Sequence, residues 1–296
     1  MTTSVTKAVI PVAGLGTRVL PASKAIPKEM MPVVDKPVIQ YVIEEAIAAG
    51  ITDIVLVTRS GKSSIEDHFD CHYELEAELE RKGKEAILAS VRDIMPAGVS
   101  ITAVRQNKAL GLGHAVLCAA PIIGDSDFAV LLPDMLINCH GQEKTDLQTM
   151  VKAYEKSQHG QIMVEPVPME HVERYGVVDC SGVTVLPGEA ADIAQMVEKP
   201  PRDEAPSNLT INGRYILPAR IMEILKDTKP GAGGEIQLTD AMVDFLKEGT
   251  LQAFHMQGKT YDCGNKAGYL QANVIYGLQN SETAESFKAF IKTLVL

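Results

Sequence analysis

The residues best suited to chemistry lie close together near the N-terminus. Gly14 and Gly16 follow a short apolar run that is typical of a buried strand, and Thr17, Arg18 and Lys28 come soon after them. Glycine allows the backbone to approach a ligand closely, and backbone N–H groups together with a guanidinium can hold phosphate oxygens. Because the chain has a net charge of −10, these cations predict a local site for the phosphates of a nucleoside triphosphate.

Two better known phosphate-binding motifs do not fit this segment. Gly14-x-Gly16 resembles the start of a dinucleotide-binding fingerprint, and Asp35 lies near the position of its ribose-binding acid. However, Val19 replaces the third glycine, and the prolines that follow leave no room for the helix that the fingerprint requires. A Walker A loop does not fit either, because no Gly-Lys-Ser/Thr follows the glycines at the required spacing.

Two acids, Asp134 and Asp262, are candidates for a functional role. Asp134 follows the apolar run 128–132, and open α/β sheets bind ligands at the carboxyl ends of such strands. Asp also favours turns and helix caps, so its position alone leaves both interpretations open. Asp262, within Tyr-Asp-Cys-Gly-Asn, is by itself no more than a turn acid.

Polar residues after two further predicted strands complete the candidates. Gln106 follows the run 100–105, and its amide offers a donor and an acceptor side by side, which can pair with the edge of uracil or thymine. Glu198 and Lys199 end the run 193–197. Such a pair usually lies on the surface, but a carboxylate can accept two hydroxyl bonds and an ammonium can bind a phosphate.

The segment from Pro11 to Pro37 resembles the signature of the sugar-nucleotide pyrophosphorylases, G-x-G-T-R-(L/V)-x-P-x-(S/T)-K-x-x-P-K-x-M-x-P. Later segments, among them Leu-Gly-Leu-Gly-His-Ala-Val, Tyr-Gly-Val-Val and Glu-Lys-Pro, extend the resemblance over most of the chain. The variants Ile-Pro-Lys-Glu-Met and Val-Asp-Lys-Pro favour the bacterial branch that joins UTP to glucose 1-phosphate. A thymidylyltransferase of the same class is the nearest alternative.

The resemblance implies a Mg²⁺ ion held by Asp134 and Asp262, with phosphate oxygens and water completing its shell. It implies that Arg18 grips the β- and γ-phosphates and that Lys28 neutralises the triphosphate near the reacting phosphorus. Lys199 is implied to anchor the sugar phosphate. In the expected reaction, an oxygen of glucose 1-phosphate attacks the α-phosphorus of UTP in line, giving UDP-glucose and pyrophosphate.

The resemblance also implies contacts to both substrates. The implied nucleotide-binding residues are Ala13, Gly14, Gly16, Thr17, Gln106, Gly111 and Gly113. The implied sugar-binding residues are Tyr175, Gly176, Glu198 and Gly213. His114 is expected to be structural, because the attacking phosphate oxygen is already ionised and needs no general base. A non-catalytic regulatory paralogue is a function of a different class, but here the triphosphate and sugar motifs are both intact.

Composition argues against several other classes. The net charge of −10 argues against a broad nucleic-acid-binding surface. No apolar run approaches the roughly 20 residues of a membrane span, so no membrane partner is expected. The five cysteines are scattered without a C-x-x-C pair, which predicts reduced thiols in a cytoplasmic protein.

The order of the predicted elements indicates the fold. Strand, loop, helix and strand follow one another in the first half, which predicts α/β architecture, and the resemblance implies a Rossmann-like three-layer α/β/α nucleotidyltransferase fold with a mostly parallel, mixed central sheet. We expect a single domain over residues 1–296. A charged helical stretch over 73–94 should weaken at Gly83. The terminal helix, 282–296, is rather apolar and is a candidate interface of a homo-oligomer, a dimer or tetramer, with packing onto its own domain as the alternative.

Overall fold

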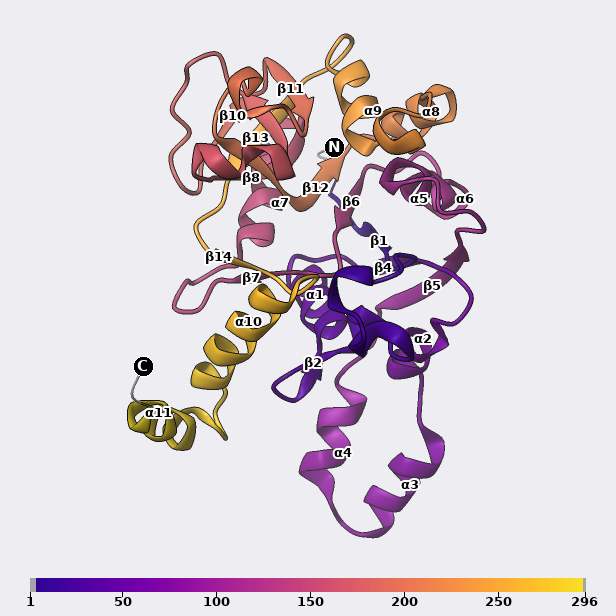
Figure 1. Cartoon of the computed structure of the whole chain (residues 1–296). Helices are drawn as coiled ribbons and strands as arrows, with labels where there is room; N and C mark the ends of the chain where they lie inside the picture. The colour runs from indigo at the N-terminus through magenta and orange to yellow at the C-terminus, as the bar shows by residue number, and fades with distance from the viewer. Residues whose placement is uncertain (1–3, 295–296) are drawn as a thin grey trace.

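The computed structural model describes residues 4–294, and at its centre is a ten-stranded sheet (Figure 1). Its strands in chain order are β1 (Lys7–Pro11), β4 (Asp53–Thr58), β5 (Ser100–Arg105), β6 (Phe128–Leu131), β8 (Gly160–Pro166), β9 (Gly176–Asp179), β10 (Ala190–Asp192), β11 (Gln195–Glu198), β12 (Leu209–Leu217) and β13 (Leu251–His255). Their order across the sheet is β10-β13-β8-β12-β6-β1-β4-β5, and β9 pairs with both β11 and β12. The first half of the chain therefore forms one half of the sheet, and the second half forms the other.

The sheet is mixed, and most of its strands run in one direction. β1 is parallel to β4 and β6, and β4 is parallel to β5. β12 runs antiparallel to β6, β8 and β9, which therefore share the direction of β1, and β13 is parallel to β8. Among the described strands of this sheet, only β10, β11 and β12 run the other way. The predicted mostly parallel sheet is confirmed.

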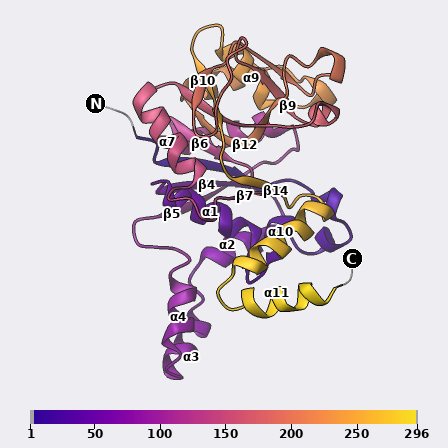
Figure 2. The ribbon, with the colours of Figure 1, turned by 90° about the vertical axis from the view of Figure 1, so that its left-hand side faces the viewer.

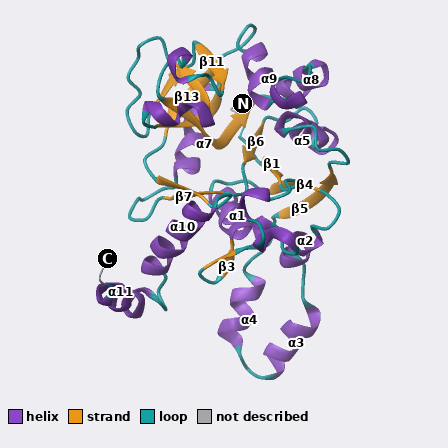
Figure 3. Cartoon of the chain, in the orientation of Figure 1, coloured by secondary structure: helices purple, strands orange, loops and turns teal. Residues whose placement is uncertain are grey.

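Helices connect the strands and lie on both sides of the sheet (Figure 2 and Figure 3). In chain order they are α1 (Val38–Ala48), α2 (Ser63–Phe69), α3 (Tyr73–Arg81), α4 (Glu85–Arg92), α5 (Leu112–Cys118), α6 (Ala120–Ile123), α7 (Asp146–Ser157), α8 (Arg220–Asp227), α9 (Leu238–Phe245), α10 (Lys266–Gln279) and α11 (Ala284–Thr293). The stretch 73–94 is two helices, because the chain turns at Gly83 with a φ of +64°, and α3 and α4 form an arm that projects from the sheet (Figure 1). Within residues 4–294, no helix has the length and apolar character needed to span a bilayer.

Alternate residues of the central strands enter two separate cores. In β1, Ala8 and Ile10 belong to one cluster of buried apolar side chains, and Val9 belongs to the other. The first cluster includes residues of α1 and α7, and the second includes residues of α5, α8 and α9. Since each face of the sheet buries its own cluster under helices, the predicted three-layer arrangement is confirmed.

Between β1 and α1 the chain forms the extended loop that the prolines predict. In this described stretch the helical pieces are single turns, η1 (Thr17–Val19), η2 (Ala22–Lys24) and η3 (Lys28–Met30), followed by a hairpin of β2 (Pro32–Val33) and β3 (Lys36–Pro37). Proline interrupts helical hydrogen bonding. The loop therefore keeps an open, irregular backbone next to the end of β1.

Two strands that the sequence pattern did not predict form a separate pair. β7 (Met135–Asn138) directly follows Asp134, and β14 (Lys259–Asp262) ends at the second candidate acid. The two strands pair antiparallel, with Met135 opposite Asp262. This pairing brings together two acids that are far apart in the chain.

Arg214 ties β12 to the turn that carries Asp134. Its side chain is fully buried, and Nη2 lies 2.7 Å both from Glu45 Oε2 on α1 and from the carbonyl oxygen of Met135. Nη1 donates to the carbonyl oxygen of Leu132. A buried guanidinium requires partners for its charge and its donors, so these contacts fix α1, β12 and the turn between β6 and β7 relative to one another.

We predict that Arg214→Ala lowers the free energy of unfolding by about 3–5 kcal/mol, because it leaves Glu45 with an uncompensated charge in a mostly buried place. Urea unfolding followed by circular dichroism measures the loss. Arg220→Ala is the matched control, since it breaks an arginine–carboxylate pair with Glu248 whose side chains are about half exposed, and its effect should be far smaller. Equal losses in the two variants would contradict the role given to Arg214.

Candidate active site

A cavity of about 380 Å³ opens at the carboxyl ends of β1, β5 and β6. Its walls come from the loop after β1, the segment after β5 and the turn after β6. Most of the predicted nucleotide-binding residues line it, together with one cation and one acid: Ala13, Gly14, Gly16, Thr17, Gln106, Gly111, Lys28 and Asp134. Open α/β sheets bind ligands at this edge, so the cavity is the candidate nucleotide site.

Gln106 presents one side of its amide to a neighbouring loop. Its Nε2 donates to the carbonyl oxygen of Gly111 at 3.1 Å and lies 3.0 Å from His114 Nδ1. Because the Gly111 carbonyl can only accept, the amide nitrogen is fixed on that side and Oε1 is left to accept from a base, as from N3–H of uracil or thymine. His114 thus orients Gln106, which agrees with the structural role predicted for it.

Gly113 lies outside the lining of the cavity, so its contact with a nucleotide stays a prediction. Its N–H donates to the carbonyl oxygen of Ile236 at 2.8 Å, and the N–H of Ile236 donates to the carbonyl oxygen of Leu110 at 2.7 Å. A Cβ on Gly113 would lie 2.8 Å from the Ile236 carbonyl oxygen, and one on Gly111 would lie 2.7 Å from Glu235 Cβ. These glycines allow the segment after β5, residues 106–113, to touch the segment 235–237. We call residues 106–113 the nucleotide loop.

Arg18 pairs with both Asp134 and Asp262 beside the cavity, and Lys28 pairs with Asp134. Arg18 Nη2 lies 3.3 Å from Asp134 Oδ2, and Arg18 Nη1 lies 3.2 Å from Asp262 Oδ2. Lys28 Nζ lies 2.6 Å from the same oxygen of Asp134. Both cations come from the loop after β1, so the predicted meeting of this cationic segment with the two acids is present in the structure.

The cations keep Asp134 ionised despite its burial. Burial alone would raise the pKa of the carboxyl group, but the charge and hydrogen bond of Lys28 and the charge of Arg18 more than offset it and lower the pKa below the ordinary value. Asp134 is therefore a carboxylate at neutral pH. The carboxylate of Asp134 can therefore bind a cationic ligand once Lys28 and Arg18 pair with a different anion.

The chemistry of the two acids suits a hard divalent cation. A Cβ on Gly264 would contact Asp134 Oδ2 and would lie 2.6 Å from Arg18 Nη2 and 2.8 Å from Asp262 Oδ1, so only glycine allows the two carboxylates and the guanidinium to meet there. Among the described residues, no group of three or more His, Cys, Asp or Glu side chains is placed to hold a metal ion. Two carboxylates suit Mg²⁺, which keeps several waters and takes further oxygens from phosphates.

Three of the four predicted sugar-binding residues lie at the ends of the paired strands β9 and β11: Tyr175 precedes β9, Gly176 begins it and Glu198 ends β11. Gly176 is opposite Glu198, and the N–H of Lys199 donates to the carbonyl oxygen of Tyr175. Lys199 has a φ of +44°, an uncommon conformation for a residue with a side chain, and its Nζ lies 3.0 Å from Glu198 Oε1. Burial raises the pKa of Tyr175, and the negative charge of Asp262 raises it further.

Gly213 supports the acid-bearing turn. It lies in a bulge of β12 with a φ of +48°, and its carbonyl oxygen accepts from the N–H of Leu132. A Cβ there would lie 3.1 Å from Met135 Cγ. The requirement for glycine is therefore explained by packing against the turn around Asp134, whereas a contact with sugar stays a prediction.

One buried ion pair next to the site was missed by sequence reasoning. Glu29, the neighbour of Lys28, is fully buried, and its Oε2 lies 2.7 Å from Lys62 Nζ. Lys62 is the residue just before α2, a helix that packs beside η3. The pair anchors the backbone that carries Lys28. No spacing in the sequence predicts that Glu29 pairs with Lys62. The only available signal was an acidic residue within Pro-Lys-Glu-Met.

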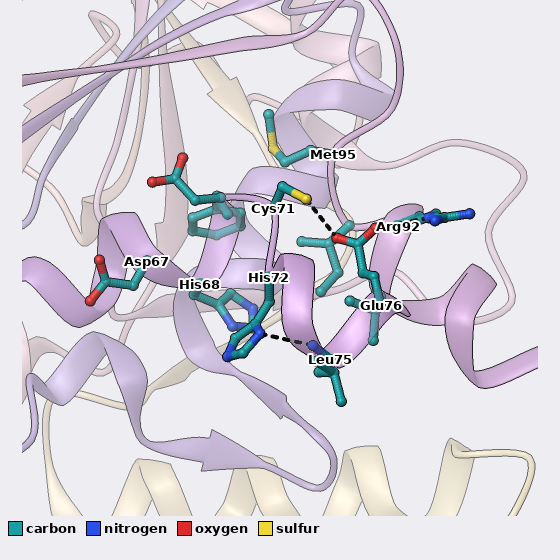
Figure 4. A pocket seen from close by; sticks show the side chains of 12 residues that line it. Asp67, His68, Cys71, His72, Leu75, Glu76, Arg92 and Met95 are labelled. Carbon is teal, nitrogen blue, oxygen red and sulfur yellow. Dashed lines mark hydrogen bonds and ion pairs between the residues drawn. The ribbon is translucent and has the colours of Figure 1, made fainter. Parts of the chain in front are cut away.

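A separate cavity of about 550 Å³ at the base of the α3–α4 arm does not have the properties of an active site (Figure 4). Its polar groups bind one another. Cys71 Sγ donates to Glu76, which also accepts from Arg92, and His72 Nδ1 accepts from the N–H of Leu75 (Figure 4). The hydrogen bond to Glu76 raises the pKa of Cys71, so its thiol is not activated as a nucleophile.

The class of the protein follows from the agreement of fold and cavity: it is a nucleotidyltransferase. The model of the family described as "Nucleotidyl transferase" matches residues 7–278. The chain is 55% identical over 292 residues to the UTP–glucose-1-phosphate uridylyltransferase of Escherichia coli (strain K12), covering 98% of this chain and 96% of that protein.

Solved structures give the same result. The chain is similar to the UTP-bound UGPase of Acinetobacter baumannii, at 51% identity and a TM-score of 0.92, covering 98% of this chain and 100% of that one. It is also similar to a UDP-glucose pyrophosphorylase complexed with UDP-glucose, at 42% identity and a TM-score of 0.83, covering 93% and 100%. The chain belongs to the nucleotidyl transferase family, among the UTP–glucose-1-phosphate uridylyltransferases.

We predict that Gly14→Ala weakens UTP binding without destabilising the fold. A Cβ on Gly14 would meet only Lys28, at 3.8 Å or more, so the protein itself has room for it. The methyl group would nevertheless occupy part of the cavity, and overpacking of this kind costs about tenfold in affinity. Isothermal titration with UTP and a thermal melt measure the two effects. Unchanged UTP affinity would remove Gly14 from the nucleotide site.

Proposed function

We propose that the chain transfers the uridylyl group of UTP to α-D-glucose 1-phosphate, giving UDP-glucose and pyrophosphate. The observation that carries the proposal is the meeting of Asp134, Asp262, Arg18 and Lys28 beside a cavity lined by the predicted nucleotide-binding residues. It is supported by relatives named for this reaction and by similar structures that hold UTP and UDP-glucose.

Both substrates are anions, so the main task is to bring negative charges together and to stabilise the charge on the leaving pyrophosphate. When bound by Asp134 and Asp262, Mg²⁺ supplies positive charge to the phosphate oxygens between the substrates. Arg18 and Lys28 turn from the acids to the triphosphate, Arg18 to the β- and γ-phosphates and Lys28 to the oxygens near the α-phosphorus. The attacking sugar-phosphate oxygen is already ionised, so no residue acts as a general base.

The sugar side uses a similar exchange of ionic partners. Lys199 leaves Glu198 for the phosphate of glucose 1-phosphate, which frees Glu198 Oε1 to accept a sugar hydroxyl. The backbone at Tyr175 and Gly176 then lies next to the sugar ring. Because Lys199 Nζ and Glu198 Oε1 are only 3.0 Å apart, one reorientation of the lysine supplies both contacts.

A thymidylyltransferase is the competing interpretation, because Gln106 can meet the same edge of uracil and thymine. The test is pyrophosphate release from native protein, Mg²⁺ and glucose 1-phosphate, with UTP and dTTP offered separately. We expect UTP to give the higher kcat/KM. A higher kcat/KM with dTTP would contradict the proposal and make the chain a thymidylyltransferase. No turnover with either nucleotide would favour a regulatory paralogue.

Three further properties belong to this proposal. The chain acts as one nucleotidyltransferase domain, supported by a sheet that is continuous through both halves. It forms a homo-oligomer, supported by α11, which has no buried residue and exposes Phe290, and by the exposed Leu294 that follows it; positions 295–296 of the predicted interface helix lie outside the described residues. It acts in the cytoplasm, supported by cysteines that are all free thiols among the described residues.

We predict that Asp134→Asn keeps the fold and lowers kcat by on the order of 100-fold or more, because it removes a charge used in the transition state. Raising the Mg²⁺ concentration should recover only part of the loss. Asp203→Asn, at an exposed position on a surface loop, makes the same change of charge away from the cavity and should leave turnover unaltered. A folded Asp134→Asn protein with near-native kcat would exclude Asp134 from the mechanism.

A further inference from the structure

The two carboxylate oxygens of Glu198 have partners of very different mobility. Oε1 lies 3.0 Å from Nζ of Lys199, whose side chain is 56% exposed. Oε2 accepts a hydrogen bond of 2.7 Å from Oγ1 of Thr239, a residue that is only 7% exposed. One partner is a long, solvated side chain, and the other is a short side chain fixed near the start of α9.

We propose that Thr239 is a positioning residue for glucose 1-phosphate, which holds Glu198 in the orientation that accepts sugar hydroxyls. The inference rests on the sugar-binding role of Glu198 in the proposed function. Thr239 lies outside the predicted sugar-binding and nucleotide-binding motifs. It acts on the sugar only through Glu198.

The physical reason is the freedom of a glutamate side chain. Its terminal torsion has a broad, shallow preference, so hydrogen bonds decide which way the carboxylate faces. Without the Thr239 hydroxyl, both oxygens of Glu198 are free to follow the ammonium of Lys199, so the ion pair between them persists and keeps the carboxylate from the sugar and the ammonium from the phosphate. The Thr239 bond holds Oε2 in place when Lys199 leaves.

The surroundings of Glu198 make this neutral donor important. Burial raises the pKa of Asp240, and the negative charge of Glu198 raises it further, so a second acid lies close to the carboxylate. A hydroxyl offers Oε2 a hydrogen bond without adding a cation that would compete with Lys199 for the sugar phosphate.

Thr239 is held by a segment that also touches the nucleotide loop. Leu238 and Met242 of α9 are buried in the core beneath β11. Just before α9, Ile236 exchanges two backbone hydrogen bonds with the Leu110–Gly113 segment. The stretch 235–239 therefore contacts both halves of the site, so Thr239 places Glu198 relative to the nucleotide as well as to the sugar.

The test begins with Thr239→Val, which keeps the branched shape and removes the donor. We expect KM for glucose 1-phosphate to rise about tenfold, the loss of one charge-assisted hydrogen bond, with KM for UTP within about twofold of native. Thr239→Ser should recover most of the loss. Thr228→Val is the matched control, since it deletes a hydroxyl bonded to the Ile224 carbonyl at the end of α8, and it should leave both KM values unchanged.

A double-mutant cycle with Glu198→Ala separates the inference from the proposed function. If Thr239 acts through Glu198, Thr239→Val has no further effect on the sugar KM once the carboxylate is gone. A Glu198→Ala protein with native sugar KM would show that the proposed role of Glu198 fails. Two outcomes would overturn only the positioning role of Thr239. In the first, Glu198→Ala raises the sugar KM but Thr239→Val does not. In the second, Thr239→Val raises the sugar KM equally in native protein and in Glu198→Ala.

Discussion

Neutralisation of Asp134 is the constraint on which the site depends. A buried carboxylate is costly unless cations and donors surround it, and here Lys28 and Arg18 both reach the same oxygen. Both cations come from the proline-rich loop after β1, so that loop must lie over the turn between β6 and β7. Arg214 fixes the same turn from behind. The position of the proline-rich loop is thus tied to one buried charge.

In the proposed mechanism, the same balance of charge governs how the substrates bind. The cations already have anionic partners, so we propose that a triphosphate replaces the carboxylates around Arg18 and Lys28, and that a divalent cation replaces these cations around Asp134 and Asp262. Each exchange keeps opposite charges in contact, which limits the cost of desolvation. Lys199 makes the corresponding exchange between Glu198 and a sugar phosphate. A reaction between ionised phosphates depends on such exchanges rather than on proton transfer.

Local patterns were enough to predict the parallel half of the sheet, the helices between its strands and the irregular proline loop. The strands β7 and β14 were missed because four-residue runs such as Met-Leu-Ile-Asn have too few alternations to be recognised. The sequence likewise offers no local signal that Arg214 is buried or that Thr239 reaches Glu198, since both depend on tertiary contacts. That Asp134 and Asp262 lie close together could be predicted only from the resemblance to a known family.

The contacts that sequence reasoning missed also set the distance between the nucleotide-binding and the sugar-binding parts of the proposed site. In-line attack requires the sugar-phosphate oxygen, the α-phosphorus and the leaving oxygen to lie on one axis, and a displacement of about 1 Å can cost on the order of 100-fold in rate. The nucleotide loop belongs to the first half of the sheet and Glu198 to the second. They are joined by β12, which bulges at Gly213, and by the stretch 235–239. Alignment of the substrates is therefore a property of these connections as much as of the side chains that touch them.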